Sequence, residues 1–213
     1  MKLDFPRVSA ELPEVWFDTI LYAEDAELEM CTVQDAVFEH ELVERARLSN
    51  MVIQNCKFTH TDFANIDITD VIFEKCDFSN ANLSKASIHR VQFKNCKLLG
   101  TDLTDTRFGN VQFEQSVLNL ASLGSSKLEK VIFQDSALKG TDFYDCKLKQ
   151  VQFQQCELDE ANFEQTPLKG IDLSDSTFST LVVSIDELKG CTVSATQAIQ
   201  FASLMGLKVK EDV

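Results

Sequence analysis

The chain has 213 residues, with 34 acidic and 20 basic side chains and a formal net charge of −14. This length is that of one domain or two small ones, and the negative balance argues against nucleic-acid binding, which needs a basic surface to neutralise phosphates. No apolar run approaches the ~20 residues of a membrane-spanning helix, and residues 1–6 lack the layout of a signal peptide, so we expect a cytoplasmic protein without a membrane partner.

The negative charge is concentrated at the two ends of the chain. Residues 1–50 hold 12 acids against 4 bases, and residues 151–213 hold 10 against 4. Residues 51–100 and 101–150 are close to neutral, with 5 acids against 6 bases and 7 against 6. Because net charge bears on partners rather than on fold, any charged interface is expected to involve the ends.

Residues 1–27 precede a regular repeat and do not follow it. They include the apolar residues Trp16, Phe17 and Leu21. Because a repetitive rod exposes an apolar end unless something covers it, we expect this segment to cap the first coil. An alternative is that it forms a recognition segment through its acids, which are Glu24, Asp25, Glu27 and Glu29.

Residues 28–193 follow a strict five-residue period. Every fifth residue from Leu28 to Val193 is Leu, Phe, Ile or Val, in 34 positions without an insertion. This period matches neither a helix nor a strand, and such internal repetition indicates a solenoid. We predict an all-β solenoid, a right-handed quadrilateral β-helix with four five-residue faces and roughly eight coils at the ~4.8 Å strand spacing. One face should stack the phenylalanines of successive coils, which are Phe73, Phe93, Phe113, Phe133 and Phe153.

Small residues occupy the position two before each apolar centre, and this position should also point inward. Two charged residues break the rule, Glu41 and Asp186. Because an unpaired buried charge is costly, we predict that the coil is distorted near both. Four of the seven cysteines share one such column with serines, so we interpret them as small core residues rather than as metal ligands or disulfides: Cys56, Cys76, Cys96 and Cys156, with Ser116, Ser136 and Ser176.

Residues 194–213 leave the repeat and carry helix signals. Ser194 followed by Gln197 forms a capping box, and Gly206 is a suitable stop. A helix this short is marginal unless it packs. We expect it to close the last coil and also to pair with a second chain about a two-fold axis. The predicted dimer interface consists of Ala198, Phe201, Ala202, Leu204 and Met205.

The sequence contains no recognisable catalytic motif. His40, His60 and His89 occupy different repeat positions, and no phosphate loop, nucleophile elbow or zinc motif is present. We therefore expect neither an enzyme nor a bound metal or cofactor.

Outward-facing residues are instead sorted by charge. One column alternates acids with Asn or Ser, and the next face collects bases from Arg107 to Lys169. A solvated surface normally mixes signs, so this separation suggests an oriented partner, with chance segregation as the alternative. The acids that we assign to partner binding are Asp62, Asp102, Asp105, Asp142, Asp145, Glu164, Asp172 and Asp175.

The repeat resembles the A(D/N)LXX consensus of the pentapeptide-repeat family over residues 28–193. Examples are the segments 81–85 and 161–165, which read ANLSK and ANFEQ. The ending, with LKGIDLS at 168–174, LKG at 188–190, TQA at 196–198 and LMGL at 204–207, is similar to the Qnr and MfpA group, and most closely to Qnr-like proteins of Gram-positive bacteria.

The resemblance implies a rod-shaped homodimer, joined through its C-terminal helices, that imitates duplex DNA. Such proteins bind DNA gyrase or topoisomerase IV and protect it from fluoroquinolones. The sequence departs from many Qnr proteins of Gram-negative bacteria, because no loop interrupts its repeat. The alternative is a pentapeptide-repeat scaffold that binds an unrelated protein partner.

Overall fold

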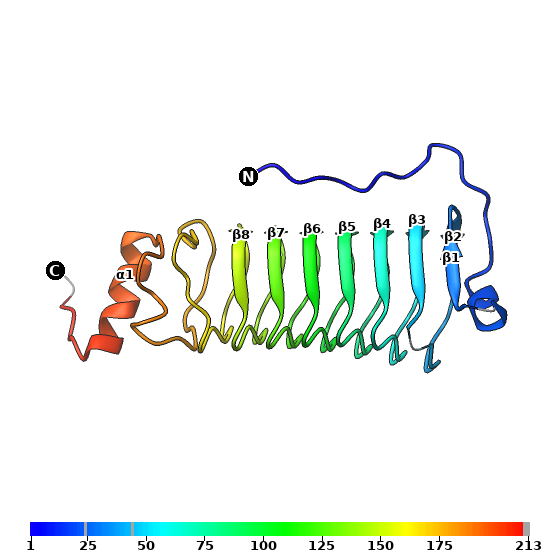
Figure 1. The fold of residues 1–213 in the computed structure, drawn as a ribbon. Helices are drawn as coiled ribbons and strands as arrows, with labels where there is room; N and C mark the ends of the chain where they lie inside the picture. The colour runs from blue at the N-terminus through cyan, green and yellow to red at the C-terminus, as the bar shows by residue number, and fades with distance from the viewer. Residues whose placement is uncertain (24, 44, 211–213) are drawn as a thin grey trace.

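The structure, a computed structural model, describes residues 1–23, 25–43 and 45–210 as a parallel-strand β-solenoid closed by one short C-terminal helix (Figure 1). Glu24 of the alternative recognition segment and the last three residues of the predicted segment 194–213 lie outside this description. In chain order the elements are η1 (Phe17–Tyr22), β1 (Glu27–Glu29), β2 (Thr32–Gln34), β3 (Arg47–Gln54), β4 (Asp67–Glu74), β5 (Ser87–Lys94), β6 (Arg107–Glu114), β7 (Lys127–Gln134), β8 (Lys147–Gln154), α1 (Ala195–Ala202) and η2 (Ser203–Met205). Within the described residues, no helix is both long and apolar enough to cross a bilayer.

Successive strands pair in parallel with a constant offset of twenty residues. Leu48 pairs with Ile68, and Phe73 pairs with Phe93. Strands β3 to β8 form one continuous sheet in sequence order, which β1 and β2 extend at the start. The solenoid predicted from the five-residue period is therefore confirmed.

The corners of the coil are residues in the left-handed backbone region, and they recur every five residues. Examples are Asn50, Asn55, Asn65 and Asp70, with φ between 53° and 63°. This conformation disfavours most L-residues, whereas Asn, Asp and Gly tolerate it. The bend at each corner turns the chain from one face of the coil to the next.

The core is a stack of inward side chains, and its clearest column is the predicted phenylalanine ladder. Neighbouring rings between Phe73 and Phe153 lie 4.8–5.1 Å apart, with interplanar angles of 5–11°. All five rings are 2% exposed or less. This spacing is the rise of one coil, and it is close to the ~4.8 Å separation of neighbouring strands.

The N-terminal end of the stack is covered by η1. The ring of Phe17 lies 4.8 Å from the rings of both Phe38 and Phe58, and Ile20 is buried beside it. Trp16 and Leu21, which we expected to lie across the first coil with Phe17, are exposed instead. A short 3-10 helix turns only part of its surface inward, and here that part carries Phe17 and Ile20.

Residues 1–8 form an extended arm that runs back along the solenoid (Figure 1). The backbone N–H of Asp4 donates to Asn110 Oδ1 at 3.1 Å, and that of Arg7 donates to Asp70 Oδ1 at 2.9 Å. Leu3 is buried, with 6% exposure. The arm therefore spans several coils along the corner at the middle of the strands, where Asp70 and Asn110 lie, a placement that the repeat pattern does not predict.

The regular sheet ends at β8. In β3 to β8 the first strand residue donates its N–H to the preceding coil, as Lys147 does to the carbonyl of Ser126 at 2.9 Å. The next residue in this column is Pro167, which has no N–H to donate. Beyond it, Asp186 is exposed within a turn over residues 185–190, which confirms the predicted distortion there.

The distortion predicted at Glu41 is wrong. Its carbonyl accepts from the N–H of Asp62 at 2.8 Å, as in a regular coil, and its side chain is exposed. Glu41 lies in the first coil, where no earlier coil covers the inward position, so its carboxylate can reach water without a change in the backbone.

Helix α1 closes the C-terminal end and begins with the predicted capping box. Ser194 Oγ accepts from the N–H of Gln197, and Gln197 Oε1 accepts from the N–H of Ser194. The buried Gln197 also donates through Nε2 to the carbonyls of Leu173 and Ser176, at 2.8 Å each. Gly206 ends the following turn with φ of 72°, as the stop signal predicts.

Candidate acidic interface

The acidic column lies on one face of the solenoid, and its members alternate between Asp and a neutral residue. Parallel bridges join Asp62 to Asn82, Asn82 to Asp102, Asp102 to Ser122 and onward through Asp142 to Asn162. All six residues are half-buried. Directly stacked like charges are destabilising, and the alternation keeps the carboxylates two coils apart.

Each Asp of this column also stabilises its own turn. Asp62 Oδ1 accepts from the N–H of Ala64 at 2.9 Å, and Asp102 Oδ1 accepts from that of Thr104 at 2.9 Å. Asn82 uses its carbonyl in the same way toward Ser84. These are Asx turns, which either Asp or Asn can form. The column residues therefore have a structural role besides any role in binding.

The neutral members link the coils. Asn82 Nδ2 donates to Asp62 Oδ1 at 2.9 Å, and Asn162 Nδ2 donates to Asp142 Oδ1 at 2.9 Å. In both pairs the amide and the turn N–H bond the same carboxylate oxygen, Oδ1. Each carboxylate of the column is therefore held by its own turn, and those of Asp62 and Asp142 are also held by an amide of the next coil.

Three further predicted acids lie beside this column and are exposed. Asp105 and Asp145 occupy coil corners, with φ of 56° and 52°. Glu164 follows Asn162 on the same face. The left-handed corner conformation is one that Asp tolerates, so the acids at these two positions have a backbone reason of their own.

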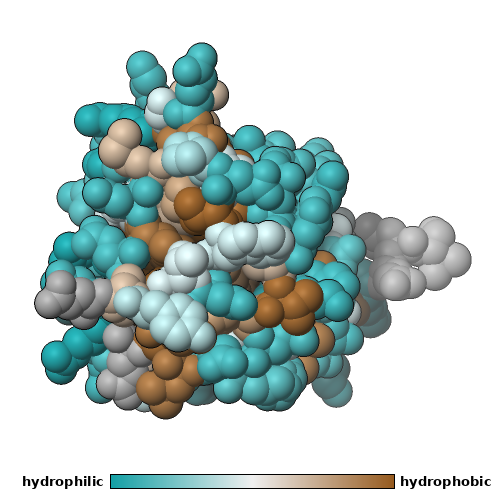
Figure 2. All heavy atoms as spheres, turned by 90° about the vertical axis from the view of Figure 1, so that its right-hand side faces the viewer, coloured by the Kyte–Doolittle hydropathy of each residue, from teal (hydrophilic) through white to brown (hydrophobic). Residues whose placement is uncertain are grey.

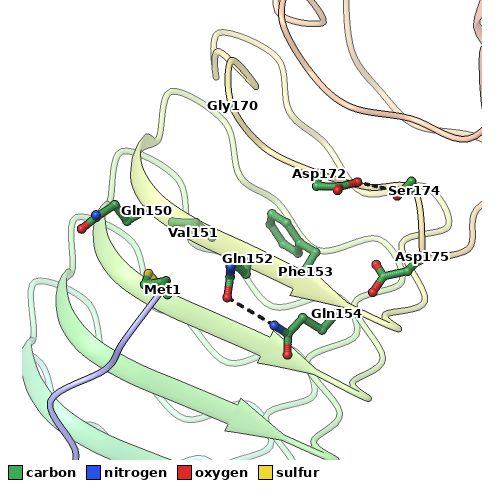
Figure 3. A pocket seen from close by; sticks show the side chains of 10 residues that line it. All are labelled: Met1, Gln150, Val151, Gln152, Phe153, Gln154, Gly170, Asp172, Ser174 and Asp175. Atoms are coloured by element: carbon green, nitrogen blue, oxygen red, sulfur yellow. Dashed lines mark hydrogen bonds between the residues drawn. The ribbon is translucent and has the colours of Figure 1, made fainter.

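The last two predicted acids, Asp172 and Asp175, line a groove of about 490 Å³ beside β8 (Figure 3). They stand on the coil after β8, across from Phe153 and Gln154, because this coil no longer pairs with the strand. Hydrogen bonds from Ser174 hold the pKa of Asp172 below its ordinary value. Asp172 continues the strand column that holds Ile132 and Gln152, ten residues out of phase with the acidic column, which runs on from Asn162 to Val182. These two acids therefore lie two faces away from the acidic column, and their assignment to the same acidic face is wrong.

The predicted dimer residues divide into two groups. Ala202 is buried, and the ring of Phe201 lies 5.5 Å from that of Phe178 in the same chain. Ala198, Leu204 and Met205 are exposed. The first group packs helix α1 against its own solenoid, and the second group is left at the surface.

The basic side of the rod is also ordered in register. Arg107 pairs with Lys127, and Lys127 pairs with Lys147, at the starts of three successive strands. All three side chains are exposed. Stacked cations gain nothing from one another, so this column does not stabilise the fold through its charges.

The cysteines behave as core residues. All seven are free thiols, and six are buried. Burial raises the pKa of Cys146 to about 12 and that of Cys156 to about 11, so both thiols are neutral at physiological pH. Across residues 1–23, 25–43 and 45–210, no three His, Cys, Asp or Glu side chains gather as metal ligands would.

Two features escaped the sequence interpretation. The first is the ion pair in which Arg90 binds Asp70 through Nε at 2.7 Å and Nη2 at 2.6 Å, beside the arm. The second is a group of exposed apolar residues in the first coil, which includes Val37 and Leu42. The exposed apolar residues could have been found in the sequence. At steps of twenty residues, Val37 and Leu42 are each followed by polar residues in the next three coils.

Comparison with known proteins agrees with this architecture. The family model described as pentapeptide repeat region matches residues 66–141 and, in an overlapping match, residues 86–163. No curated protein matches the chain.

Among solved structures, the chain is similar to HetL, a pentapeptide repeat protein involved in heterocyst differentiation regulation from the cyanobacterium Nostoc sp. strain PCC 7120. The two align with a TM-score of 0.66 and 14% identity, over 83% of this chain and 88% of HetL. A structure of QnrB1, a plasmid-mediated fluoroquinolone resistance protein, aligns with a TM-score of 0.51 and 17% identity, over 94% of this chain and 100% of its own. Residues 66–163 thus match the pentapeptide repeat region, and the chain has the fold of the pentapeptide-repeat β-helices.

Proposed function

We propose that this chain is a DNA mimic that binds a type II topoisomerase, either DNA gyrase or topoisomerase IV, and protects it from fluoroquinolones in the cytoplasm. The observation that carries the proposal is the row of carboxylates of Asp62, Asp102 and Asp142 on a straight, rigid face. A surface that normally meets DNA is basic, and a fixed row of negative charge complements it.

The row is sparser than the charge of DNA. Its carboxylates recur every second coil, or about every 10 Å at the strand spacing, whereas each DNA strand carries a phosphate per ~3.4 Å. The exposed corner acids Asp105 and Asp145 raise the charge density along the same side. We therefore expect the mimicry to rest on shape and periodicity together with charge.

The proposal includes a homodimer joined at the C-terminal ends. Ala198, Leu204 and Met205, with the neighbouring Ile199 and Leu207, leave apolar surface exposed around α1. A two-fold contact would bury the same patch of both chains and would bring their acidic C-terminal ends to the centre of the rod. Phe201 and Ala202, the other two predicted interface residues, pack helix α1 against the solenoid of their own chain.

The test is a gyrase supercoiling assay with ciprofloxacin. The protein should restore supercoiling at a concentration below the one at which it inhibits gyrase itself. Absence of rescue at every dose would contradict the proposal. If a pull-down then recovered another protein and no topoisomerase, the scaffold alternative would be favoured.

A matched pair of variants tests the carboxylate row. Asp62→Asn, Asp102→Asn and Asp142→Asn together remove three charges but keep the Oδ1 atoms that accept the turn hydrogen bonds, as Asn82 does now. This variant should fold normally and lose rescue by about tenfold or more. The control removes three charges elsewhere through Glu74→Gln, Glu114→Gln and Glu157→Gln, and it should rescue like the native protein. Equal rescue by both variants would show that the row is not the binding surface.

A further inference from the structure

The N-terminal end of the solenoid carries exposed apolar surface. Figure 2 shows this end, where hydrophobic residues form a band between hydrophilic flanks. In η1 and the residue before it, Trp16 and Tyr22 are 79% and 86% exposed, and in the first coil Val37 and Leu42 are 63% and 65% exposed. Leu21 and Met30 are also exposed at this end. A cap that only closed the core would not need these side chains.

The first coil departs from the rest of the rod at these positions. Met30, Val37 and Leu42 stand where the second coil has Asn50, Lys57 and Asp62. Bridges from Val37 to Lys57 and from Leu42 to Asp62 show that the backbone is the same in both coils. The backbone therefore does not require apolar residues here, and exposed apolar patches of this kind mark interaction sites.

The same end of the chain is rich in acidic residues. Between residues 11 and 45 the sequence has 11 acidic residues and a single basic residue, Arg45. The exposed acids include Glu11, Glu14, Asp18, Asp25, Glu29, Asp35 and Glu41. This end therefore combines exposed apolar side chains with these exposed acids, which we call the acidic rim.

We propose that the N-terminal end docks a protein segment that presents an apolar face flanked by Lys or Arg, as a basic amphipathic helix does. The apolar face would cover Trp16, Val37 and Leu42, and the cations would meet the acidic rim. A second copy of this chain does not fit, because two such ends would bring their negative rims together. The proposal concerns a surface separate from the carboxylate row and does not depend on topoisomerase binding.

Trp16 provides a direct measurement, because it is the only tryptophan in the sequence and is largely exposed. The full chain is titrated with a synthetic amphipathic helix made of Leu and Lys, and the emission of Trp16 is followed. Docking should shift the emission to shorter wavelength and saturate. Two comparison peptides are a Leu and Glu helix of the same pattern and an oligolysine of the same charge.

Variants place the binding on this end. Met30→Asn, Val37→Thr and Leu42→Asn introduce residues that the same columns hold elsewhere, namely Asn50, Thr177 and Asn82. Met30 has φ of 51°, which Asn adopts readily, so the fold should persist. The matched control, Val117→Thr with Leu120→Asn, makes equivalent changes at exposed residues in the middle of the rod.

We expect the Leu and Lys helix to bind the native chain and the control alike, and to bind the first-coil variant at least about tenfold more weakly. Neither comparison peptide should shift Trp16. If oligolysine shifted the Trp16 emission as much as the Leu and Lys helix does, the binding would be nonspecific charge attraction, and the proposal would be overturned. Equal binding of the first-coil variant would also overturn it, as would a concentration-dependent Trp16 shift without any peptide, which would indicate contact between copies of the chain.

Discussion

At the scale of single residues, the coil corners are the positions where the backbone conformation restricts which residue types fit without strain. Corner positions have φ near 50–60°, and many are filled by Asn, Asp or Gly. Leu120 has the same conformation, with φ of 58°, and is 64% exposed. The left-handed conformation of Leu120 therefore lowers the stability of the fold, and its side chain buries too little apolar surface to offset this.

We predict that Leu120→Asn stabilises the protein. The left-handed conformation costs an ordinary L-residue ~1–2 kcal/mol, and Asn tolerates it, so the free energy of unfolding should rise by about 1 kcal/mol. Urea denaturation of the two proteins measures the difference. Val117→Thr, in the same coil but not at a corner, should change stability by less than ~0.5 kcal/mol. A loss of stability in Leu120→Asn would show that its contact with the coil at Gly140 outweighs the strain.

Residue roles were predictable where the period alone decides them. Inward residues such as Phe93 follow from a count of five. The roles of Asp62 and Asp105 were only partly predictable, because an acid at the surface looks the same in sequence whether it binds a partner, closes an Asx turn or fills a left-handed corner. The structure separates these reasons through the hydrogen bond of Asp62 to Ala64 and the φ of Asp105.

At the scale of elements, the N-terminal arm is attached by a charge-dependent contact. Asp70 is buried and accepts from Arg90 and from the N–H of Arg7. The hydrogen bond from Arg90 is the main reason that the pKa of Asp70 lies below its ordinary value. A lowered folded pKa contributes stability above the unfolded pKa of ~3.9 that is lost as the pH falls through the folded value.

We therefore predict that acid loosens the arm. Hydrogen exchange of the Asp4 and Arg7 amides, corrected for the intrinsic pH dependence, should accelerate below about pH 4. In Asp70→Asn the side chain is neutral at every pH, so the arm should be looser at pH 7 and should lack this acid transition. The ladder amides of β5 and β6 serve as internal controls. An identical acid transition in Asp70→Asn would assign the effect to another group.

The success of the sequence interpretation differs between the two end elements for a physical reason. The boundaries of α1 depend on local signals, since Ser194 and Gln197 are three residues apart and bond to each other. The course of the arm depends on contacts between Arg7 and Asp70, which are 63 residues apart. The end of the sheet lies between these two cases. Pro167 is visible in the sequence, but only its place in the column of Lys147 shows that the lost hydrogen bond is the one between coils.

At the scale of the whole molecule, we predict that the C-terminal surface determines the oligomeric state. Ile199→Glu with Leu204→Glu places charge on exposed apolar residues of this end and should convert the dimer into a monomer in size-exclusion chromatography with light scattering. Phe201 is unsuitable for this test, because its packing against Phe178 is intramolecular. Val117→Glu with Leu120→Glu is the matched control and should leave the mass unchanged. A native chain that is already monomeric would reject the proposed interface.

The constant twenty-residue register has a consequence for changes in chain length. Removal of twenty residues from the middle, such as 87–106, would shorten the rod by one coil and leave every later residue on its original face. Removal of five would keep nearly the full length but would rotate every later residue onto the neighbouring face. Deletions of twenty residues would therefore change the distance between the two ends of the rod. Deletions of five would change the side on which the carboxylate row continues.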